Sequence, residues 1–256
     1  MQLLSGSRKK VLPKPNVLSR ENEKATVLRA LDVSIINHDL KTHLSPIKMC
    51  TEMLESHMAG PLNEKQDRMI RTIHSCINKL EALVGDVSDM YKLELNCMSL
   101  EKTELDIPDL MDKCANVLRP FIAEKQIELK IEFGAYGKIH ADGRRMEQVL
   151  VHLVKNAIDY VPEIDGKITI KVEKTADSDI LFCIEDNGEG VKPEDLGKIF
   201  DKFYKGTCKQ SRKYGGSGIG LTICRGIIEN HGGKIWLDSR HKNGTMFKFT
   251  IPLIKS

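Results

Sequence analysis

Two glycine clusters about 25 residues apart constrain this chain more than any other feature. The first covers residues 186–190 and follows a predicted strand that ends in a carboxylate, and the second covers residues 215–221 and precedes a predicted helix. Glycine permits positive φ angles and a close approach of ligand to backbone, and the first turn of a helix has free N–H groups that bind phosphate. The two clusters together predict a nucleotide pocket with a movable cover.

Composition and charge limit the classes of protein to be considered. The chain has 256 residues, of which 41% are hydrophobic and 29% charged, as is typical of a soluble globular protein. A net charge of +3 gives no bulk attraction to nucleic acid, so we expect no nucleic-acid partner. No apolar run approaches the roughly 18 residues that a membrane span requires, and we find no signal peptide. Seven cysteines without a Cys-x-x-Cys pair favour reduced thiols in a cytoplasmic protein over metal ligation.

Residues 1–20 form a basic tail without an acidic residue, and Pro13 and Pro15 argue against a helix there. One interpretation is a disordered tail. The other is contact with an anionic membrane surface, or a junction with an upstream sensor module. Because this stretch is too short for a sensor domain, we expect sensing to come from such a module or from a partner.

Residues 21–95 are predicted to form a helical hairpin. Its first helix covers about 21–57 and ends before Gly60-Pro61, and Asn63 with Gln66 forms a capping box for the second. The second helix has two adjacent apolar stripes with helical spacing: Met69, Ile73, Cys76, Leu80, Leu83, Val87 and Met90, and Ile70, Ile77, Val84 and Tyr91. One hairpin cannot cover both stripes, so we expect a homodimer built as a four-helix bundle. An intramolecular partner from downstream is the alternative.

After a polar linker at 96–104, residues 105–256 alternate between helical and strand patterns. We expect helices at about 106–125, 143–160, 194–203 and 217–231, and strands at 127–133, 167–174, 179–186, 233–239 and 245–251. Strands 167–174 and 179–186 each alternate apolar and polar residues. This pattern predicts a mostly antiparallel sheet that helices cover on one side, and hence an α+β chain.

Polar residues at three places would complete the pocket. Asp186 continues the buried face of its strand and needs hydrogen-bond donors, which an adenine amine and a water would supply. A tight surface turn is an equally good interpretation of this motif taken alone. Asn156 lies on a polar face of the helix at 143–160 and suits a Mg²⁺ that bridges phosphates; a solvated face is the alternative. Between the clusters, Phe200 and Phe203 lie among cations that include Lys205. A solvated loop explains these cations but leaves the phenylalanines unexplained, so we expect a lid over a polyphosphate.

A histidine in the first helix is the candidate acceptor of a phosphoryl group. Thr42 lies four residues after His38 and shares its face, and Asp39 follows His38 directly. A lone helical histidine is most often a surface or packed residue, but a neighbouring carboxylate can fix its tautomer and leave the other ring nitrogen as a nucleophile. Pro46 cannot donate a backbone hydrogen bond, so we expect a bend about one turn beyond His38.

Taken together, these motifs resemble those of two-component sensor histidine kinases over residues 21–256. Residues 38–42 look like the phosphoacceptor box and Asn156 like the magnesium asparagine of the N box. Residues 186–190 look like the G1 box, Phe200 with Phe203 like the F box, and residues 216–220 like the G2 box. Five boxes in the family's order make the match specific.

The resemblance implies a catalytic domain with the α/β sandwich of gyrase and heat-shock chaperones, using ATP with Mg²⁺. It implies phosphorylation of His38, with Asp39 as orienting base, and transfer to an aspartate of a response-regulator receiver domain. Thr42 would position water when the hairpin acts as a phosphatase. The residues implied to bind the cofactor are Asn156 (also the metal ligand), Asp159, Asp186, Gly188, Gly190, Phe203, Lys205, Gly216, Gly218, Gly220 and Leu221.

Three positions depart from the family pattern. His43 stands where a proline is common, His152 replaces the first asparagine of the N box, and Asp159 stands where a lysine is common. The helix bend and one contact on the metal side are the features these changes affect. Two other functions remain as alternatives: a phosphatase or scaffold with weak kinase activity, and a conformational ATPase that releases free phosphate.

Overall fold

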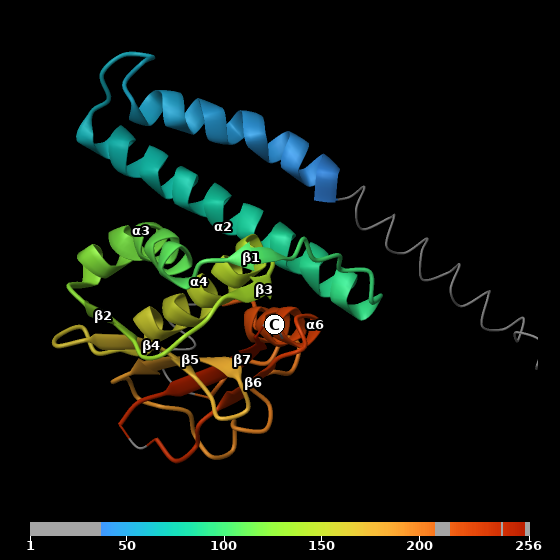
Figure 1. Cartoon of the computed structure of the whole chain (residues 1–256). Coiled ribbons are helices and arrows are strands. Elements are labelled where there is room, and N and C mark those ends of the chain that lie inside the picture. Colours follow the sequence, from blue (N-terminus) through green and yellow to red (C-terminus); the bar gives the residue numbers. More distant parts are fainter. Residues whose placement is uncertain (1–36, 208–215, 242, 254–256) are drawn as a thin grey trace, which may run out of the picture.

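The computed structural model describes residues 37–207, 216–241 and 243–253. The expected basic tail and the start of the first helix lie outside these residues, and so do the lid cations between 208 and 215. Figure 1 shows a long helical hairpin lying against a helix-and-sheet domain. Among the residues described, none of the helices is long and apolar enough to cross a membrane.

The hairpin consists of a helix over residues 37–55 and α2 (Glu64–Glu94). The predicted capping box is present: the Gln66 amide donates to the side chain of Asn63, and the Asn63 amide donates to the side chain of Gln66. Such a cap stabilises a helix by about 1 kcal/mol. The first helix continues through Pro46 without a break in its assigned residues.

Polar pairs fix how the two hairpin helices align. Lys48 on the first helix donates to Glu81 on α2 at 2.8 Å, and His74 Nδ1 lies 2.7 Å from Glu55 Oε2. Both pairs join the helices in one antiparallel register. Continuing this register toward the start of the first helix places His38 beside the turn of α2 that contains Tyr91.

Part of the hairpin's apolar surface is left uncovered by the residues that the structure describes. The uncovered large side chains are each at least 41% exposed: Leu40, Ile47, Met49, Met53, Met58, Met69, Ile73, Leu80 and Leu83. In contrast, Ile77 and Val84 are buried, and Met90 packs into the core of the second domain. The second domain therefore covers the apolar side chains at the end of α2, as the alternative of an intramolecular partner expected. The exposed apolar side chains on the rest of the hairpin have the composition of a surface that a second copy would cover.

The second domain is built on a five-stranded sheet in the order β2-β4-β5-β7-β6. Its strands are β2 (Glu128–Phe133), β4 (Lys167–Lys174), β5 (Asp179–Asp186), β6 (Lys234–Leu237) and β7 (Met246–Pro252). Of the pairings among these described strands, only β2–β4 is parallel, so the predicted mostly antiparallel sheet is confirmed. A small ladder of β1 (Thr103–Leu105) and β3 (Ile139–Ala141) was not predicted, because three-residue strands give too little alternation to read from sequence.

Three helices cover one face of this sheet: α3 (Ile107–Lys125), α4 (Gly143–Tyr160) and α6 (Gly220–Asn230). The predicted covering of one side by helices is confirmed, and Figure 1 shows these helices between the sheet and the hairpin. The central helix, α4, buries Val149, Leu150, Leu153 and Val154 completely. Each such side chain stabilises the fold by about 1.5–3 kcal/mol. This anchoring fixes the opposite face of α4, which carries the polar residues of the site.

One predicted helix and one predicted helix boundary were wrong. Residues 194–203 form turns and bends instead of a short helix. The last helix begins at Gly220, three residues later than expected, because residues 216–219 remain a loop before the first helical turn. That loop belongs to the cavity described next.

Candidate active site

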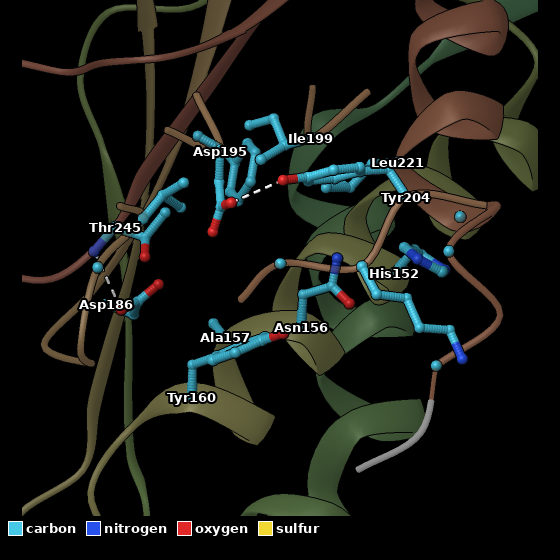
Figure 2. Close-up of a pocket in the computed structure, with 18 of the residues that line it drawn as sticks. His152, Asn156, Ala157, Tyr160, Asp186, Asp195, Ile199, Tyr204, Leu221 and Thr245 are labelled. Atoms are coloured by element: carbon cyan, nitrogen blue, oxygen red, sulfur yellow. Dashed lines mark hydrogen bonds between the residues drawn. The ribbon is translucent and has the colours of Figure 1, made fainter. Parts of the chain in front are cut away.

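A cavity of about 190 Å³ lies where α4, the start of α6 and the ends of β5 and β7 meet. Figure 2 shows side chains from these separate elements converging on it. His152, Asn156 and Tyr160 follow one another at four-residue spacing along α4 and form one wall. Residues from the segment 190–206 form much of the opposite side, so the described part of the predicted lid lines the cavity.

Asp186 ends β5 and is 5% exposed. Its Oδ1 accepts backbone hydrogen bonds from Gly188 at 2.8 Å and from Thr245 at 3.1 Å. Burial raises the pKa of this carboxyl above its usual range, while these donors act in the opposite direction. A carboxylate has several acceptor positions, and Figure 2 shows its second oxygen turned toward the cavity. That oxygen suits a ligand amine, such as the exocyclic amine of adenine.

Gly188 belongs to the site by supporting Asp186, although it does not line the cavity. A Cβ atom at residue 188 would lie 2.6 Å from the Tyr160 carbonyl oxygen and 2.9 Å from Asp186 Oδ1. Only glycine therefore fits here while the carboxylate keeps its position. Gly190, in contrast, lines the cavity directly.

The second glycine cluster provides a place for phosphate. Gly216, Gly218, Gly220 and Leu221 all line the cavity. The N-cap of α6 is Ile219, which makes no side-chain capping hydrogen bond, so the N–H groups of the first turn remain available to an anion. Gly218 has a φ of 71° and packs against the backbone of Phe203, which joins the loop to the lid segment.

His152 packs against this helix terminus. A Cβ atom at Gly220 would overlap its imidazole ring. Burial lowers the pKa of His152 to about 4, so the ring is neutral at physiological pH. A neutral ring adds no charge beside the phosphate site, and its main observable effect is to fix the position of residue 220. His152, which stands where the family pattern has an asparagine, thus forms part of the cavity wall.

Not every predicted residue lines the cavity. Lys205 does, but Phe203 is 62% exposed and lies outside the lining. Asp159 is also outside it, with its Oδ1 3.9 Å from Lys125 Nζ. Phe200 packs edge-on against Phe247 with ring centroids 6.2 Å apart, so it anchors the lid segment to the sheet.

Sequence reasoning missed a polar cluster around the buried Asp195, at the base of the lid segment. The Tyr204 hydroxyl donates to Asp195 Oδ1 at 2.6 Å, and the Thr207 amide donates to Asp195 Oδ2 at 3.0 Å. Asp195 and Tyr204 both line the cavity, and Figure 2 marks the bond between them. Tyr160 and Thr245 were missed as well. In sequence these residues look like ordinary surface polar positions, and only the fold brings them together.

The candidate phosphoacceptor lies on the hairpin. His38 is exposed, and its Nδ1 lies 3.6 Å from Asp39 Oδ1, which is ion-pair distance but longer than a hydrogen bond. The Thr42 hydroxyl donates to the His38 carbonyl oxygen at 2.8 Å. Within the described chain, the hairpin contributes no residue to the lining of the cavity. The nucleotide pocket therefore lies in the second domain, whereas His38 lies on the hairpin, outside the pocket lining.

Comparison with known protein families agrees with this division. Residues 33–96 match the His Kinase A (phospho-acceptor) domain, and residues 141–255 match the Histidine kinase-, DNA gyrase B-, and HSP90-like ATPase family. Among curated proteins, the Autoinducer 2 sensor kinase/phosphatase LuxQ of Vibrio parahaemolyticus is 29% identical over 243 residues. That alignment covers 93% of this chain and 28% of LuxQ, so the chain spans little more than a quarter of its relative.

Solved structures give the same result. The catalytic domain of histidine kinase ThkA is 35% identical, with a TM-score of 0.52, and the match covers 59% of this chain and 95% of that domain. ThkA in complex with the response regulator protein TrrA matches 91% of this chain and 63% of that chain, at 26% identity and a TM-score of 0.58. Full-length ShkA in complex with AMPPNP shares the fold at 23% identity, with a TM-score of 0.72 over 88% of this chain and 46% of that chain. The chain belongs to the two-component sensor histidine kinases.

Proposed function

We propose that this chain is an ATP-dependent histidine autokinase that phosphorylates His38 and passes the phosphoryl group to an aspartate of a response-regulator receiver domain. The observation that carries the proposal is the convergence of Asp186, Asn156 and the uncapped start of α6 on one cavity. Asp186 suits the adenine amine of ATP, Asn156 suits the Mg²⁺ that accompanies ATP, and the start of α6 suits the phosphates. A histidine beside a carboxylate is present on the attached hairpin.

Each side chain has a distinct task in this reaction. Asp186 accepts the adenine amine, and the free N–H groups of α6 hold phosphate oxygens. The Asn156 side chain points into the cavity in Figure 2, and its amide oxygen is a suitable ligand for Mg²⁺. The metal, when bound, offsets negative charge on the phosphate oxygens. Lys205 adds a cation from the lid segment.

The attacking group is a ring nitrogen of His38. A neutral imidazole nitrogen attacks the γ-phosphorus in line, the bond to the β,γ-bridging oxygen breaks, and ADP leaves with the electron pair of that bond. Asp39 orients the ring by holding the proton on the other nitrogen, which requires the 3.6 Å separation to shorten during the reaction. Thr42, one turn further along the same face, positions water when the hairpin removes phosphate from the receiver.

Two partners follow from the same proposal. The exposed apolar side chains of the hairpin favour a homodimer, in which two hairpins form a four-helix bundle. A receiver domain is favoured by the ThkA complex with the response regulator TrrA, and the dual activity by the name of LuxQ, a sensor kinase/phosphatase. We propose domain limits of 21–95 for the hairpin and 105–256 for the catalytic domain, and a cytoplasmic location.

The fate of the γ-phosphate tests this function. The protein is incubated with γ-labelled ATP and Mg²⁺, and label is measured on the protein and in solution. Protein-bound label that is lost in acid and kept in base is expected for phosphohistidine. Free phosphate without bound label would instead identify a conformational ATPase. Tight ATP binding without turnover would identify a phosphatase or scaffold.

A further inference from the structure

A second cleft, of about 510 Å³, lies between the hairpin and the catalytic domain. Its lining comes from the first hairpin helix, α2, α3 and α4, and it shares no residue with the lining of the nucleotide cavity. Sites for small organic ligands usually have volumes of about 300–1,000 Å³. The cleft is therefore large enough for a second ligand that binds apart from the nucleotide.

Three cationic side chains from three separate elements line this cleft. Lys41 lies on the first hairpin helix, Lys92 on α2 and Arg144 in the first turn of α4. Within the described part of the chain, none of the three forms an ion pair with an acidic side chain. Like charges that face one cleft repel each other, and an anion between them offsets this repulsion. The lining therefore favours a ligand with more than one negative charge.

A buried arginine adds an ordered donor to the same lining. Arg145 is 7% exposed, and its Nη1 lies 2.5 Å from Asp89 Oδ2 and 2.8 Å from Gln148 Oε1. Both contacts use Nη1, and the other side-chain nitrogens of Arg145 donate to no acceptor among the described residues. A guanidinium group has five N–H donors, and its planar fork matches phosphate oxygens. Because Asp89 and Gln148 already hold the side chain, binding an anion would cost little additional order.

The rest of the cleft suits an organic group better than a bare inorganic anion. Val117 on α3 and Val151 on α4 contribute apolar surface, and Val117 is 42% exposed. Gly85 on α2 leaves open space, because a Cβ atom there would meet nothing within 4 Å. The half-buried carboxylate of Glu147 would repel a bare anion but can accept a hydrogen bond from a ligand hydroxyl.

We propose that this cleft binds a soluble organic phosphate. Its phosphate group contacts the cations Lys41, Lys92 and Arg144 together with the free edge of the Arg145 guanidinium. Its organic part covers the two valines and fills the space beside Gly85. Binding requires neither ATP nor transfer to His38, so its outcome is independent of the proposed kinase activity.

Pyridoxal 5′-phosphate is a probe with these properties, because its aromatic ring carries both a phosphate group and an aldehyde. The aldehyde condenses with a lysine amine with loss of water, and borohydride reduces the resulting imine to a stable amine. The protein is titrated without ATP, and peptide mapping locates the label. We expect saturable labelling at Lys41 or Lys92, which mapping separates from any label on Lys205. Labelling spread over the surface lysines without saturation would overturn the proposal.

A charge variant tests the phosphate contact. Arg144→Gln removes one cation and leaves both lysines of the cleft available for labelling. We expect the probe concentration for half-maximal labelling to rise about tenfold, the equivalent of one hydrogen bond to a charged group. Lys113→Gln is the matched control, because it removes an exposed cation of α3 outside the lining and should leave this concentration unchanged. Equal half-maximal concentrations for Arg144→Gln and wild type would exclude the phosphate contact.

A filling variant tests the space without changing any charge. Gly85→Leu should fold, since a Cβ atom at residue 85 has room and leucine is a better helix former than glycine. Thermal unfolding checks that it does. The leucine side chain would occupy the cleft, so we expect saturable labelling of the cleft lysines to be lost. Labelling as in wild type would show that the probe binds elsewhere.

Competition distinguishes an organic phosphate from a simple anion. Phenyl phosphate and inorganic phosphate are compared as inhibitors of the labelling. Because the phenyl ring would cover the two valines, we expect phenyl phosphate to protect at a concentration at least about tenfold lower. Equal protection by the two would indicate an anion site without the apolar contact and would overturn the assignment of an organic phosphate.

Discussion

The imidazole ring of His152 packs against Gly220 so closely that a side chain at residue 220 would overlap it. This contact joins the polar face of α4 to the first turn of α6, where the phosphate groups of a nucleotide would bind. The two residues are 68 positions apart in sequence (220 minus 152), so the contact is a property of the fold. Because of this contact, adding a single methyl group at residue 220 should displace the start of α6 at the phosphate end of the cavity.

Gly220→Ala should weaken nucleotide binding. Overpacking costs about 1–3 kcal/mol, which corresponds to roughly a tenfold to hundredfold loss of affinity if the α6 terminus is displaced. Gly197→Ala is the control outside the cavity lining, because a Cβ atom there meets nothing within 4 Å. Titration with a fluorescent ATP analogue measures both. Equal affinities for the two variants would contradict the steric role of His152.

Asp186→Asn should separate ligand recognition from folding. The Asn carbonyl oxygen still accepts from Gly188 and Thr245, but an NH₂ group replaces the oxygen that faces the cavity. Because an amine and an amide NH₂ are both donors, we expect about a tenfold to hundredfold loss of ATP affinity, the equivalent of one hydrogen bond to a charged group. Thermal unfolding should stay near wild type, whereas Asp186→Ala should lose both. Wild-type affinity in Asp186→Asn would exclude the adenine role.

Asp186 and Asn156 show how much of the site could be predicted from the sequence alone. Both line the cavity. Each could be singled out from sequence because it lies in a local pattern: the end of an alternating strand for Asp186 and the polar face of an amphipathic helix for Asn156. The Asn63–Gln66 cap is local in the same way. Asp195 with Tyr204, and Asp89 with Arg145, could not be predicted, because they depend on how distant segments pack.

Tyr204→Phe should loosen the base of the lid segment. The substitution removes the hydroxyl that donates to Asp195 Oδ1 and leaves a buried carboxylate oxygen short of a donor. The hydrogen bond to Asp195 raises the pKa of Tyr204 to about 12, so the hydroxyl remains a donor throughout the physiological range. We expect nucleotide to dissociate faster, because the lid segment loses a hydrogen bond that fixes its base. Stopped-flow displacement measures the rate, and an unchanged rate would contradict the coupling.

The raised pKa of Asp86 should make the free energy of unfolding depend on pH in a specific way. Burial, and secondarily the charge of Asp89, raise the pKa of this α2 carboxyl to about 6 from a usual value near 3.8. A raised carboxyl pKa contributes stability that is fully present below the unfolded pKa and is lost as pH rises through about 6. Asp86→Asn stays neutral, so its stability relative to wild type should increase between pH 4 and pH 7. Urea unfolding at several pH values tests this, and a pH-independent difference would contradict it.

The most direct test of the central claim compares wild type with His38→Gln in γ-labelled ATP and Mg²⁺. His38 does not line the cavity, so the substitution should leave nucleotide affinity intact while removing the acceptor nitrogen. The account predicts acid-labile, base-stable label on the wild type, located by peptide mapping to the segment with His38, and none on His38→Gln. Equal labelling of the two proteins, or label on another residue of the wild type, would contradict it.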